Sequence, residues 1–169
     1  HLYKIPITGM RFFTVYGPWG RPDMAPMIFA NSIFSKKPIK VFNNGKMSRS
    51  FTYIDDVIES IQKLIKKPAI KDQKFDKKNP NPSTSWCPHM IFNIGNNKSV
   101  PLEDFITLLE KEIGIKAIKE YKKMQLGDVK TTHADTSILR DWVGELKETS
   151  LENGIKKFVS WYKKFYNYQ

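Results

Sequence analysis

The segment RFFTVYGPWGRPDMA, residues 11–25, constrains the fold of this chain more than any other part of the sequence. It continues a β-rich apolar run that starts at residue 7 and stops at Gly17, and it ends in a Gly/Pro loop that carries Arg21. Such a run is typical of a buried parallel strand, here residues 7–16, that leads into a functional loop. Open α/β sheets bind ligands at loops that follow the carboxyl ends of their strands. The sequence therefore predicts a ligand loop around Arg21.

A second segment, RSFTYIDD beginning at Arg49, places another arginine ahead of an acidic helix start. Thr52 is a residue type that can cap this helix. Asp55 and Asp56 would then lie in its first turn, where carboxylates stay ionised and act as cap and packing anchors rather than as acid/base catalysts. Two fixed guanidinium groups, those of Arg21 and Arg49, suit an anionic ligand such as a diphosphate.

Apolar strands alternate with amphipathic helices along the rest of the chain. Besides the helix that follows Thr52 and ends at Pro68, helical spacing of apolar residues predicts four more helices, the third of the five being capped by Gly114. We expect these four at residues 24–34, 101–113, 136–143 and 151–166, and further strands at 39–42, 90–94 and 117–121. This alternation is typical of the α/β class with a mainly parallel sheet.

Size and composition narrow the class of protein. A chain of 169 residues with 40% hydrophobic content can bury one substantial core. It has no run of about 18 apolar residues and no signal-like N-terminus, so we expect a cytoplasmic protein without a membrane partner. Cys87 is the only cysteine, which excludes an internal disulfide. His89 and His133 have no second ligand at helical or loop spacing, so we expect no metal site.

The net charge of +11 is compatible with a nucleic-acid partner and has to be weighed. Only Arg11, Arg21, Arg49 and Arg140 are arginines among the 28 Lys and Arg residues. Proteins that read bases favour arginine forks, and no nucleic-acid-binding motif accompanies the scattered lysines. We therefore expect no nucleic-acid partner.

The combination of YGPWGRPDMA with NGKMSRSFTYIDD resembles extended short-chain dehydrogenase/reductase (SDR) nucleotide-sugar epimerases, and most closely UDP-glucuronate 4-epimerases. Similar words extend from Pro6 to Tyr166 in the order of that family's C-terminal part. The resemblance implies the C-terminal portion of a Rossmann-type extended SDR fold, with the remaining parallel strands and a small substrate-binding subdomain. It assigns remnants of the Rossmann sheet and its helices to residues 1–23, 50–66 and 90–100, the substrate-binding subdomain to 24–49 and 101–169, and a surface loop to 67–89.

The sequence contains neither the glycine-rich GxxGxxG turn nor the catalytic YxxxK pair of that family. The resemblance therefore implies that the N-terminal NAD-binding half is missing and that this chain is a fragment. The parent enzyme would bind NAD tightly, oxidise C4 of UDP-glucuronate to a ketone and return the hydride to the opposite face, giving UDP-galacturonate. We expect the fragment to show no turnover, no tight NAD binding and at most weak affinity for a UDP-sugar.

The resemblance also assigns ligand roles to three residues in the first third of the chain. Arg21 is a candidate partner for the hexuronate carboxylate, and its local alternative is an ion pair with Asp23. Arg49 would reach the nucleotide diphosphate, and its local alternative is an ion pair with one of the first-turn aspartates. Phe42 would stack on uracil, and its alternative is a role in the strand core.

Two further groups are assigned by the same resemblance. Phe12, Phe13 and Thr14 would lie beside the nicotinamide ring and the sugar diphosphate, with the two phenylalanines on the cofactor and Thr14 on the substrate. Gln125 and Asp128, in the loop MQLGDV, would hold the ribose and the phosphates.

The N-terminal half that the resemblance implies is missing determines which partners we expect for this chain. The strand at residues 8–16 would have lost a neighbour, so we expect exposed apolar surface and a homo-oligomer. Two alternative functions stay open: another NAD-dependent nucleotide-sugar epimerase or dehydratase, and a noncatalytic module that binds a nucleotide-sugar or a protein.

Overall fold

The computed structural model describes residues 1–168 as an α/β fold in which short strands pair in parallel between helices. The helices are α1 (Ala25–Phe34), α2 (Ile54–Lys66), α3 (Leu102–Ile113), α4 (Ser137–Val143) and α5 (Leu151–Phe165), with a 3-10 turn, η1 (Phe42–Gly45). The strands are β1 (Ile7–Phe12), β2 (Thr14–Tyr16), β3 (Pro38–Val41), β4 (Ser48–Arg49), β5 (Phe51–Tyr53), β6 (His89–Ile94), β7 (Val100–Pro101) and β8 (Ile118–Tyr121). All five predicted helices are present, each within about two residues of its expected ends.

The strands form four pairs. Three are parallel, β1 with β6, β2 with β5 and β3 with β8, and the fourth, β4 with β7, is antiparallel. The parallel α/β class predicted from the sequence is confirmed. The short pair β4 and β7 was not predicted, because two-residue strands carry no periodic pattern.

The single strand predicted at residues 7–16 is wrong in two respects. Phe13 interrupts it, because its backbone N–H donates to the carbonyl of Ile94 (3.1 Å) before the chain changes partner from β6 to β5. The first half is also not buried, since Ile7 and Phe12 of β1 are 48% and 50% exposed. Only β2, which ends at the buried Tyr16, enters the core.

The start of α2 also differs from expectation. Thr52 belongs to β5, so the helix begins after Tyr53, and no side chain caps it. The Thr52 hydroxyl instead accepts a hydrogen bond from the backbone N–H of Asn96 (2.9 Å). Asp56 does serve as an anchor, because its carboxylate accepts two hydrogen bonds from Thr149, which lies just ahead of α5. Gly114 ends α3 in the left-handed conformation (φ 82°), as predicted.

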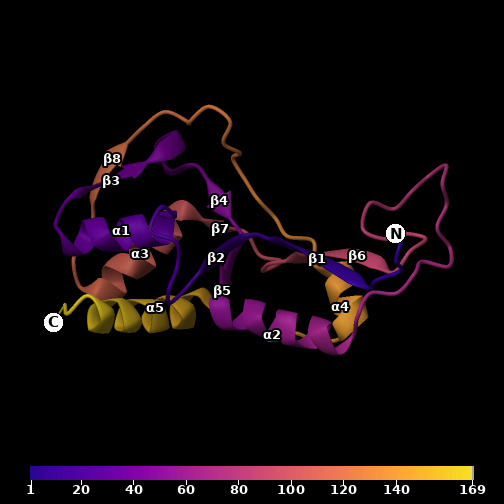
Figure 1. Ribbon diagram of the computed structural model, residues 1–169. Helices are drawn as coiled ribbons and strands as arrows, with labels where there is room; N and C mark the ends of the chain where they lie inside the picture. The colour runs from indigo at the N-terminus through magenta and orange to yellow at the C-terminus, as the bar shows by residue number, and fades with distance from the viewer. Residues whose placement is uncertain (169) are drawn as a thin grey trace.

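Figure 1 shows the arrangement of these elements, which pack around two hydrophobic clusters. The larger cluster fills the space between α1, α3, α5 and the strands β2, β3 and β5, and Phe105 and Phe158 are fully buried in it. The smaller cluster joins α2, α4 and β6 around Phe92. Within residues 1–168, no helix is both long and apolar enough to cross a membrane.

Candidate functional site

A pocket of about 620 Å³ opens beside the larger core cluster. Its walls come from β2, the loop after it, α1, β3, η1, β4, β5, the start of α3 and the loop that follows β8. This volume is within the range that holds small-molecule ligands. The pocket brings together five of the six residues assigned to the substrate: Thr14, Phe42, Arg49, Gln125 and Asp128.

Arg49 makes three hydrogen bonds, more than any other charged side chain that lines this pocket. Its guanidinium donates to the Asp128 carboxylate (2.8 Å) and to the backbone carbonyls of Ser48 (2.9 Å) and Lys130 (3.2 Å). The side chain of Arg49 is 16% exposed and that of Asp128 35%. Because Ser48 forms a β-bridge with Thr131, the segment that follows β8 runs alongside Arg49.

The local alternative for Arg49, an ion pair with Asp55 or Asp56, is wrong. Asp56 is engaged by Thr149, and the ion pair of Asp55 is with Lys157 at 3.6 Å. Arg49 is paired with a distant residue that was itself assigned to the ligand.

Arg21 is placed differently from the other assigned residues. It lies in the loop after β2 and does not line the pocket, although Asp23, two residues later, does. Its guanidinium donates two hydrogen bonds to the Asp23 carboxylate, at 3.1 and 2.5 Å, so the local alternative for Arg21 is the contact observed. Both side chains are mostly exposed, and the bond from Arg21 lowers the pKa of the Asp23 carboxyl below its ordinary value.

Phe12 and Phe13, the residues assigned to the cofactor, lie outside the pocket lining. Phe12 ends the exposed strand β1, and Phe13 packs against Gly95, where an added Cβ would lie 3.2 Å from the Phe13 Cβ. The assignment of both residues to the cofactor stays a prediction.

Sequence reasoning missed several residues that line the pocket. The apolar wall includes Ile28 and Phe29 of α1 together with Phe51, and the charged lining residues that had not been assigned to the ligand are Asp23 and Lys40. Lys40 alternates in β3 with the buried residues on either side and so lies on the opposite face from the core, but this alternation does not distinguish it from the other exposed lysines of the chain. In residues 1–168 no group of three or more His, Cys, Asp or Glu side chains is placed to hold a metal ion.

The sequence matches the model of the NAD dependent epimerase/dehydratase family over residues 1–95. The chain belongs to this family. It is 45% identical to Protein CapI of Staphylococcus aureus over 98% of this chain and 50% of that protein. It is 41% identical to a probable UDP-glucuronate 4-epimerase of Rhizobium meliloti, over 98% of this chain and 49% of that protein.

The fold agrees with this membership. The structure resembles UDP-glucuronic acid 4-epimerase from Bacillus cereus, in complex with UDP-glucuronic acid and NAD, with a TM-score of 0.77 and 33% identity. The similarity covers 96% of this chain and 46% of the Bacillus cereus chain. The chain thus spans about half the length of the family members that it matches.

Proposed function

We propose that this chain is the substrate-binding portion of an NAD-dependent UDP-sugar epimerase, corresponding to the C-terminal part of the family. The parent reaction would convert UDP-glucuronate to UDP-galacturonate through a 4-keto sugar. One observation carries the proposal: five residues assigned to the nucleotide-sugar come from separate parts of the sequence and line one pocket.

The hydrogen bonds of Arg49 leave room for an anionic ligand. A guanidinium has five N–H donors, and the three acceptors of Arg49 use both hydrogens of Nη1 and one of Nη2. The second hydrogen of Nη2 and the Nε hydrogen have no protein acceptor within residues 1–168. A diphosphate could therefore accept from Arg49 while Asp128 stays in place to accept from a ribose hydroxyl.

The remaining lining suits the other parts of such a ligand. Phe42 offers an aromatic face for a base, and the apolar surface contributed by Ile28 and Phe29 excludes water around the charged groups. Thr14 adds a small hydroxyl to the wall, and Gln125 an amide. A partly buried, prearranged guanidinium in such surroundings binds a diphosphate more strongly than an exposed one.

The cofactor is assigned to the parent enzyme rather than to this chain alone. The sequence has no GxxGxxG turn, and Phe12 and Phe13 lie outside the lining of this pocket, so we do not expect tight NAD binding by this chain alone. NAD would supply hydride transfer when bound to the parent enzyme. The part played by this chain is to hold and orient the sugar nucleotide.

A direct test is to titrate the chain with UDP-glucuronate and UDP-glucose and to follow the amide signals of labelled protein by NMR. We expect saturable binding of UDP-glucuronate with a Kd weaker than about 0.1 mM, because the chain spans only about half the length of the family members that it matches. Replacement of Phe42 by Ala should weaken binding further, whereas Lys66→Met, on an exposed position of α2, should not. Absence of any binding at millimolar ligand would refute the proposed site, and micromolar binding without a second half would refute its incompleteness.

A chimera tests the reaction. This chain would be joined to the part of the Rhizobium meliloti relative that it does not cover, and the product would be followed by chromatography of UDP-glucuronate and UDP-galacturonate. We expect interconversion by the chimera and none by this chain with added NAD. Turnover of a different nucleotide-sugar would favour the broader epimerase or dehydratase assignment, and a folded chimera that binds without turnover would favour a noncatalytic module.

A further inference from the structure

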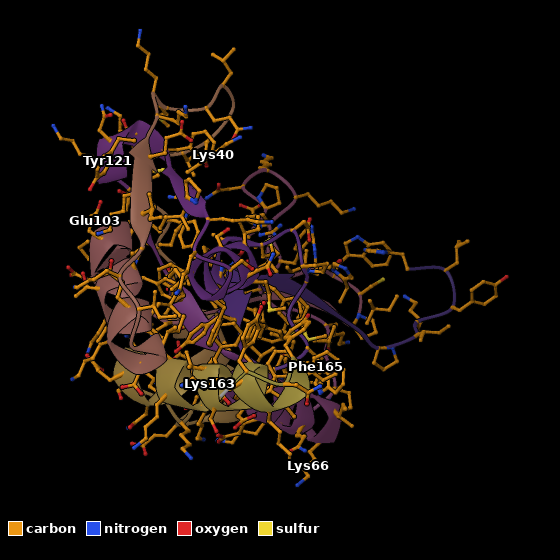
Figure 2. All side chains as sticks on the ribbon, turned by 90° about the vertical axis from the view of Figure 1, so that its left-hand side faces the viewer. Lys40, Lys66, Glu103, Tyr121, Lys163 and Phe165 are labelled. Carbon is orange, nitrogen blue, oxygen red and sulfur yellow. The ribbon has the colours of Figure 1, made fainter. Side chains whose placement is uncertain are left out.

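Lys40 lines the pocket but is not among the residues assigned to the nucleotide-sugar. Lys40 lies in β3 between Ile39 and Val41, which are 1% and 0% exposed, so its side chain projects away from the core. It lines the same pocket as Phe42 and Arg49. Figure 2 shows Lys40 on β3, at the end of the molecule that also carries Tyr121 of the neighbouring strand β8.

Among the charged residues that line the pocket, Lys40 alone has no ion-pair partner within residues 1–168. Four charged side chains line it: Asp23, Lys40, Arg49 and Asp128. Asp23 is neutralised by Arg21, and Arg49 by Asp128. Lys40 forms no ion pair with any carboxylate of residues 1–168 within 4.0 Å.

The nearest strand offers no ready counter-ion. Glu120 is the register partner of Lys40 in the parallel pair β3 and β8. The Glu120 carboxylate is held by Lys122 at 2.6 Å, and the hydrogen bond and charge of Lys122 lower the pKa of Glu120 more than the charge of Lys40 does, so Lys122 is its main counter-ion. The ammonium of Lys40 is therefore the pocket charge left over after the two arginine–aspartate pairs cancel.

We propose that Lys40 is the specificity-determining cation that makes this pocket prefer phosphate-bearing ligands over their uncharged nucleosides. This inference rests on the proposed function, because it assumes that the pocket receives a nucleoside diphosphate. A lysine ammonium is a compact charge on a flexible stem, so it can follow a phosphate without the fixed geometry that Arg49 provides. Arg49 would orient the ligand, and Lys40 would supply net attraction.

The test compares UDP with uridine as probes and uses four forms of the full chain: unaltered, Lys40→Met, Lys40→Arg and Lys66→Met. Methionine keeps most of the apolar stem of Lys40 and removes the charge. Lys66→Met removes an equal charge from an exposed position in the last turn of α2, which Figure 2 shows far from Lys40. Dissociation constants would be measured by NMR titration at two salt concentrations.

We expect Lys40→Met to weaken UDP binding about three- to tenfold and to leave uridine binding unchanged, as for one partly solvated charge contact. Lys40→Arg should retain UDP affinity, Lys66→Met should match the unaltered chain, and the effect of Lys40→Met should shrink at high salt. Equal losses for UDP and uridine would place Lys40 on the base and overturn the inference. An unchanged UDP affinity in Lys40→Met would overturn it while the proposed function survives, whereas failure of the unaltered chain to bind UDP at all would end both.

Discussion

Two arginine–aspartate pairs in this protein differ in burial but not in chemistry, and this permits a controlled prediction. The pair Arg49–Asp128 has an N···O distance of 2.8 Å, and its side chains are 16% and 35% exposed. The pair Arg21–Asp23 has a shorter distance of 2.5 Å and a second hydrogen bond, but its side chains are 74% and 63% exposed. If distance determines the strength of such pairs, Arg21–Asp23 is the stronger. If the strength of such pairs is determined by their removal from water, Arg49–Asp128 is the stronger pair.

The coupling energy expected for Arg49–Asp128 follows from the hydrogen bonds of the two side chains. Hydrogen bonds to charged groups contribute roughly 1.5–3 kcal/mol when buried, and exposed ion pairs about 0.2–1 kcal/mol. Because Asp128 is about one-third exposed, we expect a coupling energy between Arg49 and Asp128 of about 1–1.5 kcal/mol. Arg49→Met should cost more, about 3 kcal/mol, since it also removes the bonds to the carbonyls of Ser48 and Lys130. Asp128→Asn keeps an acceptor oxygen and should cost about 1 kcal/mol.

The measurement is a double-mutant cycle for each pair, with free energies of unfolding taken from urea titrations followed by circular dichroism. The variants are Arg49→Met, Asp128→Asn and their double, and Arg21→Met, Asp23→Asn and their double. We expect the second cycle to give a coupling within experimental error, because both groups are largely hydrated. A coupling for Arg21–Asp23 equal to or above that for Arg49–Asp128 would refute the reasoning from burial. A change in the urea dependence of any variant would signal an altered denatured state and would exclude that variant from the cycle.

Three further outcomes are expected. Gly154→Ala should destabilise the chain by roughly 1–3 kcal/mol despite its gain in helix propensity, because the new Cβ would lie 1.9 Å from the Tyr16 hydroxyl. Adding Tyr16→Phe to this variant should recover part of the lost free energy of unfolding. Ser160→Ala on the same helix is the control and should leave the urea unfolding curve unchanged. Burial raises the pKa of Glu110, but its bond from Lys116 and another from a backbone amide outweigh burial and leave the pKa below its ordinary value of 4.5. The stabilisation by Glu110 is therefore present above pH 4.5 and lost as pH falls through the lowered value, and Glu110→Gln should flatten the dependence of Tm on pH in this range. The exposed face of β1 should favour self-association, so sedimentation at micromolar concentration should show an oligomer, and a monodisperse monomer would contradict this.

Local patterns were enough to predict the helices of this fold. The spacing of apolar residues and end signals such as Gly114 are contained within a dozen residues, so each helix can be recognised alone. The pairing of strands cannot be recognised in this way, because it depends on segments far apart in the sequence. Residues 7–16 form one continuous apolar pattern, yet the two halves pair with β6 and β5. Thr52 failed as a cap for the same reason, since strand pairing of β5 took precedence over its intrinsic preference.

The site was predictable where a sequence pattern carried it. Arg49, Asp128 and Phe42 were assigned from words that resemble a family, and the structure places them on one pocket. Lys40 was missed because a single lysine in a lysine-rich chain carries no distinguishing pattern until the strand that holds it is placed beside the pocket. Arg21 shows the opposite limit: its segment matches the family, but its nearest partner, Asp23, is only two residues away and satisfies the guanidinium locally.

The exposure of β1 follows from the same distinction between pattern and partner. An apolar strand sequence reflects the surface that a segment is suited to contact, and it does not identify what covers that surface. Ile7 is 48% exposed on one face of β1, and Met10 and Phe12 are 36% and 50% exposed on the other face, although the strand is fully paired along one edge with β6. A groove of about 260 Å³ beside them, lined by Met10, Ile61 and Ile65 among others, continues this apolar surface onto α2. Because the family members that the chain matches are about twice as long, we expect the corresponding face of a full-length family member to be covered by residues outside the matched part, and the sequence of β1 to be adapted to that burial.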